Sequence, residues 1–163
     1  IIGLGNPDPE YQNTFHNLGH TIADYLQKLE IQNSKFKILK TDVYMNKSGL
    51  FVKEAIKKYK VKPEQLLIIH DDSDIELGKY KLSFNRSSGG HKGVQNVMNQ
   101  LKTEAFWRLR IGIRPPFAKA TRGKNKSRLK ANDLVLKKIS PSAKKTLDKV
   151  FKEIKKLSIF SRP

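Results

Sequence analysis

One short stretch of the chain limits the fold more than any other. The run from Leu66 to Ile69 is continuously apolar and of strand length, and it stops at the polar residues from His70 to Asp72. A strand with no polar face is typical of the centre of a parallel or mixed sheet that helices cover on both faces. Because the carboxyl ends of such strands gather at one edge, we expect a functional site there.

Amphipathic helices are predicted around this buried run. Apolar residues recur at three- and four-residue spacing from Asn17 to about Ile31, and again from Pro141 to Leu157. Ser48 is expected to cap another helix that runs to about Tyr59. A further helix is predicted after the glycine-rich segment 87–93. A glycine-rich loop followed by a helix suits a phosphate group.

Other strands are predicted at 35–44, 80–84 and 106–113. In the last of these, apolar residues alternate with Arg108 and Arg110, so we expect the two guanidinium groups to point away from the core. Strands that alternate with helices predict a three-layer α/β fold, a single domain over 1–163 with a mixed, mostly parallel sheet flanked by helices. Residues 1–7 read as the end of a first strand, so we expect residues to be missing upstream of Ile1.

The charge of the chain indicates a polyanionic partner. Lys and Arg number 33 against 15 Asp and Glu, a net charge of +18, which favours nucleic acid through counterion release. The excess is concentrated after residue 113, and 114–131 is predicted to be an exposed basic loop. A solvated, lysine-rich surface remains the alternative.

Several classes of protein are excluded or disfavoured by composition. The chain has no cysteine, which excludes thiolate catalysis and a disulfide framework and fits the reducing cytoplasm. It has neither a signal-peptide pattern nor an apolar run long enough to cross a membrane. We therefore expect a cytoplasmic protein with no membrane partner.

Five polar residues at predicted strand ends or loops are the candidates for chemistry: Asn6, His16, Asn46, Asp71 and His91. A histidine at the start of a helix can act as a general base for water if a carboxylate orients it. Asp71 is the favoured partner; Asp72 would point elsewhere in an extended backbone, and Asp74 ranks below both. Each candidate also has a structural alternative: a turn, a helix cap or a loop hydrogen bond.

Two other kinds of site are weaker interpretations. Gly3 and Gly5 begin a dinucleotide-binding pattern, but Asp8 replaces its third glycine. A metal site from His16, His70, His91 and Asp71 is conceivable, yet His16 and His20 lack the glutamate of a zinc-protease helix. We predict no metal and no cofactor.

Six segments, taken in order, resemble bacterial peptidyl-tRNA hydrolases. They are GLGNP at 3–7, Tyr11 with His16-Asn17, YMNKSG at 44–49, HDDSD at 70–74, GGHKG at 89–93 and RLRIGI at 108–113. Residues 132–136 and the last helix resemble the C-terminal part of that family. The resemblance implies an esterase that cleaves the bond between a peptide and the 3′-terminal ribose of tRNA. It implies a monomer whose partner is peptidyl-tRNA, with no obligatory protein partner.

The resemblance also implies roles for individual residues. His16 matches the catalytic base, Asp71 the carboxylate that orients it, and Asn6 a catalytic asparagine. The positions implied for substrate or tRNA binding are Tyr11, Asn17, Tyr44, Met45, Asn46, Lys81, His91, Lys92 and Arg110. Of these, Lys81 and Arg110 match residues that contact tRNA phosphates.

The chain departs from the family pattern at two positions. Phe15 stands where the family usually has arginine, and Lys92 stands where it usually has a substrate-binding asparagine. Two alternatives stay open. One is a non-catalytic relative on the same fold, similar to a plastid intron-splicing factor, because fold does not fix function. The other is a basic RNA-binding module with no chemistry.

Overall fold

A five-stranded mixed sheet forms the centre of the molecule. The computed structural model describes residues 1–29, 36–115 and 134–157. The strands are β1 (Ile2–Gly3), β2 (Leu39–Lys40), β3 (Leu67–Glu76), β4 (Tyr80–Phe84) and β5 (Trp107–Arg114). They lie in the order β2-β1-β3-β5-β4. All neighbours are parallel except β4, which pairs antiparallel with β5 at the edge.

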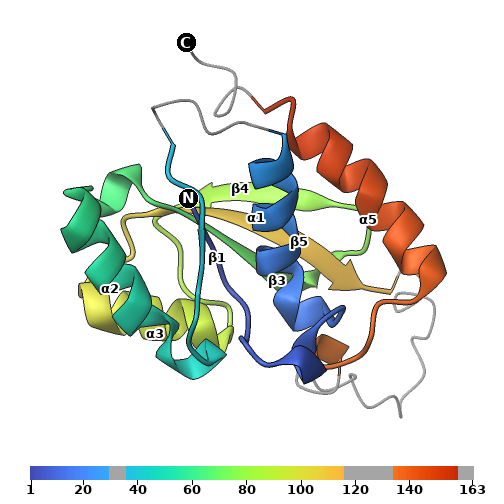
Figure 1. Ribbon diagram of the computed structural model, residues 1–163, viewed down its shortest axis with the longest axis horizontal. Helices are drawn as coiled ribbons and strands as arrows, with labels where there is room; N and C mark the ends of the chain where they lie inside the picture. The colour runs from blue at the N-terminus through green and yellow to red at the C-terminus, as the bar shows by residue number, and fades with distance from the viewer. Residues whose placement is uncertain (30–35, 116–133, 158–163) are drawn as a thin grey trace.

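Helices cover both faces of this sheet (Figure 1). The helices α1 (Leu18–Lys28) and α5 (Pro141–Ile154) lie on one face, and α2 (Ser48–Tyr59) and α3 (Lys92–Leu101) lie on the other. The predicted three-layer α/β fold with a mixed, mostly parallel sheet is therefore confirmed. The predicted helix from Pro141 and the strand 80–84 are also confirmed.

Two apolar clusters separate the layers. One joins α1 and α5 to the sheet and includes Leu26, Leu147, Ile69 and Ile111. The other joins α2 and α3 to the opposite face and includes Val52, Val97 and Ile68. Ile68 and Ile69 are both fully buried, on opposite faces of β3. This arrangement explains why the run that begins β3 has no polar face.

Three predicted boundaries were wrong. The strand predicted over 35–44 is limited to Leu39–Lys40 among the described residues. The central strand does not end at the polar residues but continues to Glu76, because Asp71 and Asp72 still pair with β5. Ser48 is not a cap: Lys47 precedes the helix, and the Ser48 hydroxyl donates to the carbonyl of Met45.

The two arginines of β5 are not exposed, contrary to the sequence-based expectation. The alternation itself is correct, because Leu109, Ile111 and Ile113 face the cluster formed with α1 and α5. On the other face, however, Arg108 is 1% and Arg110 9% exposed. Both guanidinium groups bond to other parts of the chain, Arg108 to two carbonyls and Arg110 to Asp72. These hydrogen bonds make the burial of the charges tolerable.

Some of the expectations concern segments that the structure does not describe. The predicted basic loop 114–131 lies outside the described residues apart from Arg114 and Pro115, as does Ile31 at the end of the first predicted helix. Within the described parts of the chain, no helix is both long enough and apolar enough to span a membrane.

Candidate active site

Three residues from different elements meet at the carboxyl edge of the sheet. His16 lies in a short 3₁₀ turn (Phe15–Asn17) directly before α1, Asp71 lies in β3, and His91 is the N-cap of α3. They line a pocket of about 120 Å³, whose wall is completed by Asp72, Ser73, Ser88–His91, Lys92 and Val135. The predicted pair of His16 and Asp71 is thus in contact.

Asp71 binds two imidazole rings through a single oxygen atom. Its Oδ1 lies 2.9 Å from His16 Nδ1 and 3.1 Å from His91 Nε2. The carboxylate is almost fully buried, with 2% of its side chain exposed, whereas His16 retains 12%. An ionised carboxylate only accepts hydrogen bonds. Both rings must therefore donate to it.

The hydrogen bonds determine where each ring carries its proton. The Nδ1 atom of His91 accepts from the backbone N–H of Val94, so its proton is on Nε2 and is donated to Asp71. His16 donates through Nδ1, so the Nε2 atom of its neutral ring is unprotonated. That nitrogen has no partner among the described residues. His16 therefore presents a basic nitrogen to the pocket while Asp71 fixes its other side.

The surroundings of Asp71 keep it ionised. Burial by itself would raise the pKa of Asp71, but the electrostatic interaction with the His91 ring and the hydrogen bonds from His16 and His91 hold it well below the ordinary value. A permanent negative charge beside His16 stabilises an imidazolium, which forms when this ring takes a proton.

A third histidine, His70, contacts both Asp71 and His91. His70 is fully buried, and its Nδ1 atom donates to the carbonyl of Asp71. Its ring meets His91 edge-on, with 4.6 Å between centroids. Burial, and next the electrostatic interaction with the His91 ring, hold the pKa of His70 well below its ordinary value. His70 is thus neutral, and its Nε2 atom is the one buried side-chain polar atom without a partner in the described part of the chain.

Residues 137–139, which follow the undescribed segment 116–133, hold the turn that contains His16 in place. The ammonium of Lys138 donates to the carbonyls of Glu10 and Gln12 at 2.6 and 2.8 Å. Backbone hydrogen bonds then join Phe15 to Lys137 and Ile139 to Asn13. The turn that contains His16 is therefore held by residues that are distant in the sequence, although it lies before the first α-helix.

Two of the asparagines predicted as site residues, Asn6 and Asn17, are hydrogen bonded to each other. The side-chain amide of Asn17 bonds to both the N–H and the carbonyl of Asn6 at 2.9 Å. Asn6 in turn accepts from the N–H of Met45 through Oδ1, and its Nδ2 atom has no described partner. Both asparagines line a polar pocket of about 490 Å³, which shares no lining residue with the pocket that contains His16. Asn17 is committed to positioning Asn6.

The other predicted substrate-binding residues lie around the pocket at different depths. Lys92 lines the pocket of His16 and also a groove that it shares with Asn46, Asn96 and Asn99. Met45 is buried and belongs to the apolar cluster under α3.

The two predicted tyrosines line none of these three pockets. Tyr44 is exposed and donates its hydroxyl to Asp8, and Tyr11 lies in the turn that follows Asp8.

The two residues predicted to contact phosphates differ in availability. Lys81 and Arg110 are directly opposite each other in the β4–β5 pair, so their side chains share a face. Lys81 is exposed, whereas Arg110 is buried and donates from Nε to Asp72 at 2.7 Å. Asp72 therefore points to Arg110 and not to His16, as the extended backbone predicted. A phosphate contact by Arg110 competes with this ion pair.

The same three residues could also be read as ligands of a metal ion. His16, Asp71 and His91 offer ligand atoms within 4.8 Å of one another. Those atoms are joined by hydrogen bonds from one ring N–H of each histidine to Oδ1 of Asp71. A metal ion bound at these atoms would have to displace both hydrogen bonds to Asp71.

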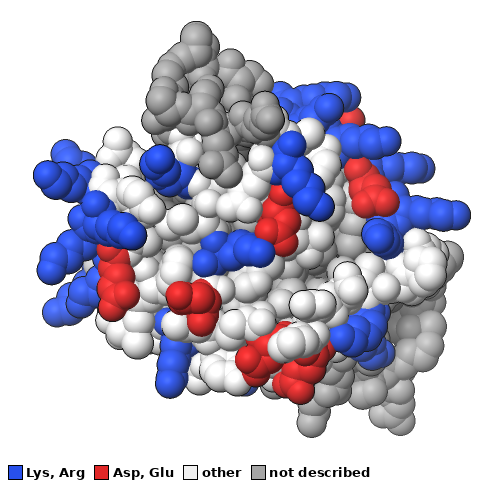
Figure 2. Space-filling model, in the orientation of Figure 1, with Lys and Arg blue, Asp and Glu red and all other residues white. Residues whose placement is uncertain are grey.

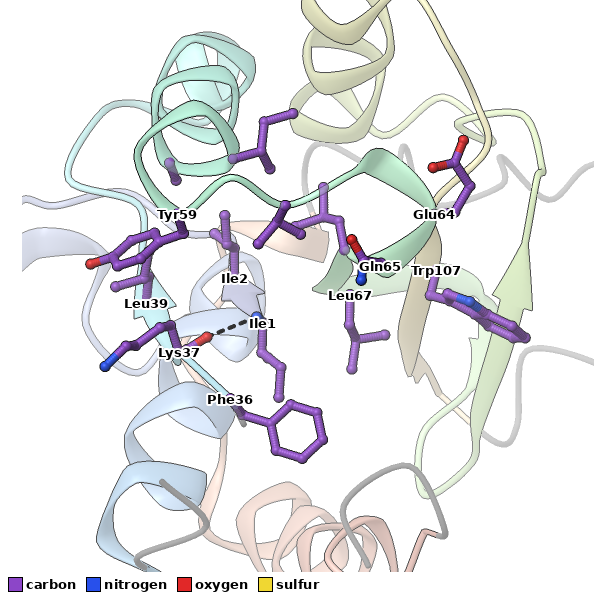
Figure 3. A pocket seen from close by; sticks show the side chains of 14 residues that line it. Ile1, Ile2, Phe36, Lys37, Leu39, Tyr59, Glu64, Gln65, Leu67 and Trp107 are labelled. Atoms are coloured by element: carbon purple, nitrogen blue, oxygen red, sulfur yellow. Dashed lines mark hydrogen bonds between the residues drawn. The ribbon is translucent and has the colours of Figure 1, made fainter. Parts of the chain in front are cut away.

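A larger cavity lies at the opposite edge of the sheet. It measures about 560 Å³ and is lined mainly by apolar side chains at the amino ends of the strands, including Ile2, Leu67 and Trp107 (Figure 3). The amino group of Ile1 donates there to the carbonyl of Lys37 at 2.8 Å. It contains no histidine, and sites in open α/β sheets form at the other edge.

Sequence reasoning missed several residues of the candidate site. Ser88 and Gly90 were noted only as parts of a glycine-rich loop, although they form the wall of the pocket. Val135 was noted only as part of a C-terminal segment. The hydrogen bond from His70 to the carbonyl of Asp71 was not predicted either. In the pairing of β3 with β5, His70 lies beside Arg110. The sequence of a single strand does not predict how that strand is aligned with its neighbour.

Comparisons with known proteins identify the family of this chain. The family described as peptidyl-tRNA hydrolase matches residues 1–161. The peptidyl-tRNA hydrolase of Sulfurihydrogenibium sp. is 37% identical over 166 residues, which cover 92% of this chain and 83% of the relative. That of Mycoplasmopsis synoviae is 43% identical over 126 residues, covering 69% and 67%.

A solved structure of a peptidyl-tRNA hydrolase, from Acinetobacter baumannii, is similar with a TM-score of 0.78 and 29% identity, covering 93% of this chain and 82% of that one. With the family match over nearly the whole length and relatives above 30% identity, this chain belongs to the peptidyl-tRNA hydrolase family.

Proposed function

We propose that this enzyme cleaves the ester between a peptide and the 3′-terminal ribose of tRNA, with His16 as the general base. The observation that carries the proposal is the hydrogen bond of 2.9 Å between His16 Nδ1 and the buried carboxylate of Asp71. It leaves the Nε2 atom of His16 free at the pocket, where a water molecule can lose a proton to it.

The reaction proceeds in two proton transfers. His16 takes a proton from water while the water oxygen attacks the carbonyl carbon of the ester, and Asp71 stabilises the resulting imidazolium. The tetrahedral intermediate then expels the ribose oxygen. His16 returns the proton to that oxygen, which yields a free carboxylic acid and an intact 3′ end.

Asn6 is the proposed donor to the developing oxyanion. Its carbonyl and N–H groups are held by Asn17, and its Oδ1 atom by Met45. The Nδ2–H group is thereby oriented, and it has no partner among the described residues. A preorganised donor of this kind stabilises negative charge more in the transition state than in the ground state.

The reaction can be tested with an N-blocked peptidyl-tRNA in water enriched in ¹⁸O. We expect free peptide with one ¹⁸O atom in its carboxylate and tRNA without the label. Protein that binds the substrate but leaves it intact would support a non-catalytic relative and contradict the proposal. Label in the ribose oxygen would show that the wrong bond is cleaved.

A competition experiment separates this enzyme from a basic RNA-binding module. If the pocket recognises the ester, tRNA with an esterified and N-blocked end competes for His16→Ala protein better than tRNA with a free end. Equal competition would indicate that the protein binds only the tRNA body.

The proposed substrate is a product of translation, which supports a cytoplasmic location. We also propose a monomer as the active species, which is what the resemblance to the family implies. Sedimentation of active protein at assay concentrations checks the second point. Activity found only in a dimeric fraction would contradict it.

A further inference from the structure

Arg108 is the largest fully buried side chain among the described residues and does not form an ion pair with any of them. Its Nη2 atom donates instead to two carbonyls, those of Arg86 at 2.7 Å and Ser87 at 2.9 Å. Burial, and next the charge of Arg110, lower the pKa of Arg108 to about 10. It remains charged at neutral pH, and backbone carbonyls replace the water around the charge.

The two carbonyls belong to the segment that connects β4 to α3, here called the 85–91 loop. Three of its residues, Asn85, Gly89 and Gly90, have positive φ angles of 47°, 61° and 84°. Within the loop, His91 donates its N–H to the carbonyl of Ser88. Because such a backbone is costly to order, the buried guanidinium is well placed to fix the base of the loop.

The 85–91 loop determines two features of the candidate active site. Ser88, Gly89 and Gly90 form one wall of the pocket that contains His16. His91, the last residue of the loop, bonds to Val94 on one side and to Asp71 on the other. A shift at the base of the loop would therefore change the second hydrogen bond that Asp71 accepts, and with it the position of Asp71 relative to His16.

We propose that Arg108 is a positioning residue for the reaction, which holds the 85–91 loop so that His91 reaches Asp71 and the wall of the pocket is complete. The inference rests on the proposed function for its kinetic consequences. Its structural part, that Arg108 controls the contact between His91 and Asp71, stands apart from catalysis. The neighbouring Arg110 has a different partner, Asp72, so the two arginines do not substitute for each other.

The test uses Arg108→Lys, which retains the charge but ends in a shorter side chain without the guanidinium Nη2 that bonds to both carbonyls. We expect the single-turnover rate of peptide release to fall about 10- to 100-fold, as positioning effects allow. The affinity for tRNA should change less than about threefold. In an His91→Ala background the same substitution should cost less than about threefold, because the contact through which Arg108 acts is already missing.

A magnetic resonance measurement gives a readout that does not depend on activity. The ring N–H protons of His16 and His91 that bond to Asp71 should give downfield signals, and the His91 signal should be lost or shifted in Arg108→Lys. Gly89→Ala provides a second variant, because a side chain there strains the loop without a clash. We expect Gly89→Ala to shift the same His91 signal. This measurement remains possible if Arg108→Lys does not fold.

Two results would overturn the inference. One is an equal rate loss from Arg108→Lys with and without His91. The other is an unchanged His91 signal in folded Arg108→Lys, or in Gly89→Ala if the first variant does not fold. Failure of the proposed function is distinct, since wild-type protein would then release no peptide while the His91 signal still reports on Arg108.

Discussion

At the scale of single residues, the site converges on one atom, the Oδ1 of Asp71. It accepts hydrogen bonds from His16 and His91, and the backbone carbonyl of the same residue accepts from His70. Each contact limits the orientation of another ring, so that only His16 keeps an unpaired ring nitrogen beside the pocket. The geometry thus distinguishes the proposed base, His16, from the other two histidines of the site.

Replacing the carboxylate tests its role directly. In Asp71→Asn the amide loses the charge that stabilises imidazolium, and it can accept through only one of its two atoms. We expect kcat/KM for peptidyl-tRNA to fall by at least about 10²-fold. The matched control is Glu54→Gln on the exposed side of α2, which should change kcat/KM less than about twofold. Similar losses in both variants would contradict a specific role.

His20 gives a prediction for stability against pH. Its Nε2 atom lies 3.0 Å from the hydroxyl of Thr41, and burial, followed by the charge of Lys40, lowers the pKa of His20 from 6.5 to about 4. Protonation therefore favours the unfolded chain. The stabilisation is complete above pH 6.5 and is lost as the pH falls towards 4, by about 3 kcal/mol at most.

Denaturant unfolding between pH 7 and pH 4 measures this effect. The control is His20→Gln, whose amide can still donate to Thr41 but does not titrate. In this variant the free energy of unfolding should decline less between pH 7 and pH 4 than in wild type. His70 still contributes to the decline, whereas position 20 does not. An identical decline in wild type and variant would rule out His20 as a cause.

At the scale of elements, the close approach of α1 to the sheet places His16. Gly19 lies in the first turn of α1, and a Cβ there would come within 2.3 Å of the carbonyl oxygen of Leu4 and 2.4 Å of that of Ile69. The helix can thus pack directly on β1 and β3. The position of the turn that contains His16, directly before α1, follows from this contact.

Gly19→Ala should therefore be destabilising, although alanine favours a helix by about 1 kcal/mol over glycine. The overlap with two carbonyls must displace α1, and we expect a net loss of about 1–3 kcal/mol together with reduced activity. Denaturant unfolding checks it, with the exposed residue Thr21 replaced by Ala as control. A more stable Gly19→Ala protein would show that α1 can move without cost.

The elements also show what a sequence can and cannot predict. Apolar periodicity was sufficient for the layers and for the central strand, because burial on two faces leaves a visible pattern. The prediction for Arg108 and Arg110 was wrong because a polar face in a strand looks the same whether water or a loop covers it. The pairing of His16 with Asp71 was predicted, whereas the bond from His91 depends on the fold of the 85–91 loop.

At the scale of the whole molecule, charge is unevenly distributed. Figure 2 shows Lys and Arg side chains over α2 and along α5. Exposed lysines there include Lys53, Lys57 and Lys58 of α2. A net charge of +18 attracts polyanions over long distances. Attraction by itself does not identify the surface that holds tRNA.

We propose that the basic segment 114–131 is the part of the chain that binds tRNA. Replacing Lys124, Lys126 and Arg128 by Gln should weaken tRNA binding and reduce the slope of log K against log salt by about 2–3 units, which corresponds to three phosphate contacts. Hydrolysis of a short model ester should not change. Replacing Lys53, Lys57 and Lys58 removes the same charge as a control. Equal effects on the slope would indicate general attraction only.

The most direct test of the account is the rate of peptide release from bound peptidyl-tRNA in a single turnover, measured for wild type and His16→Ala. With substrate saturated by enzyme, the account predicts a loss of about 10²- to 10⁴-fold and a binding constant within about threefold of wild type. Release by His16→Ala at a rate close to that of wild type would contradict the assignment of His16 as the base.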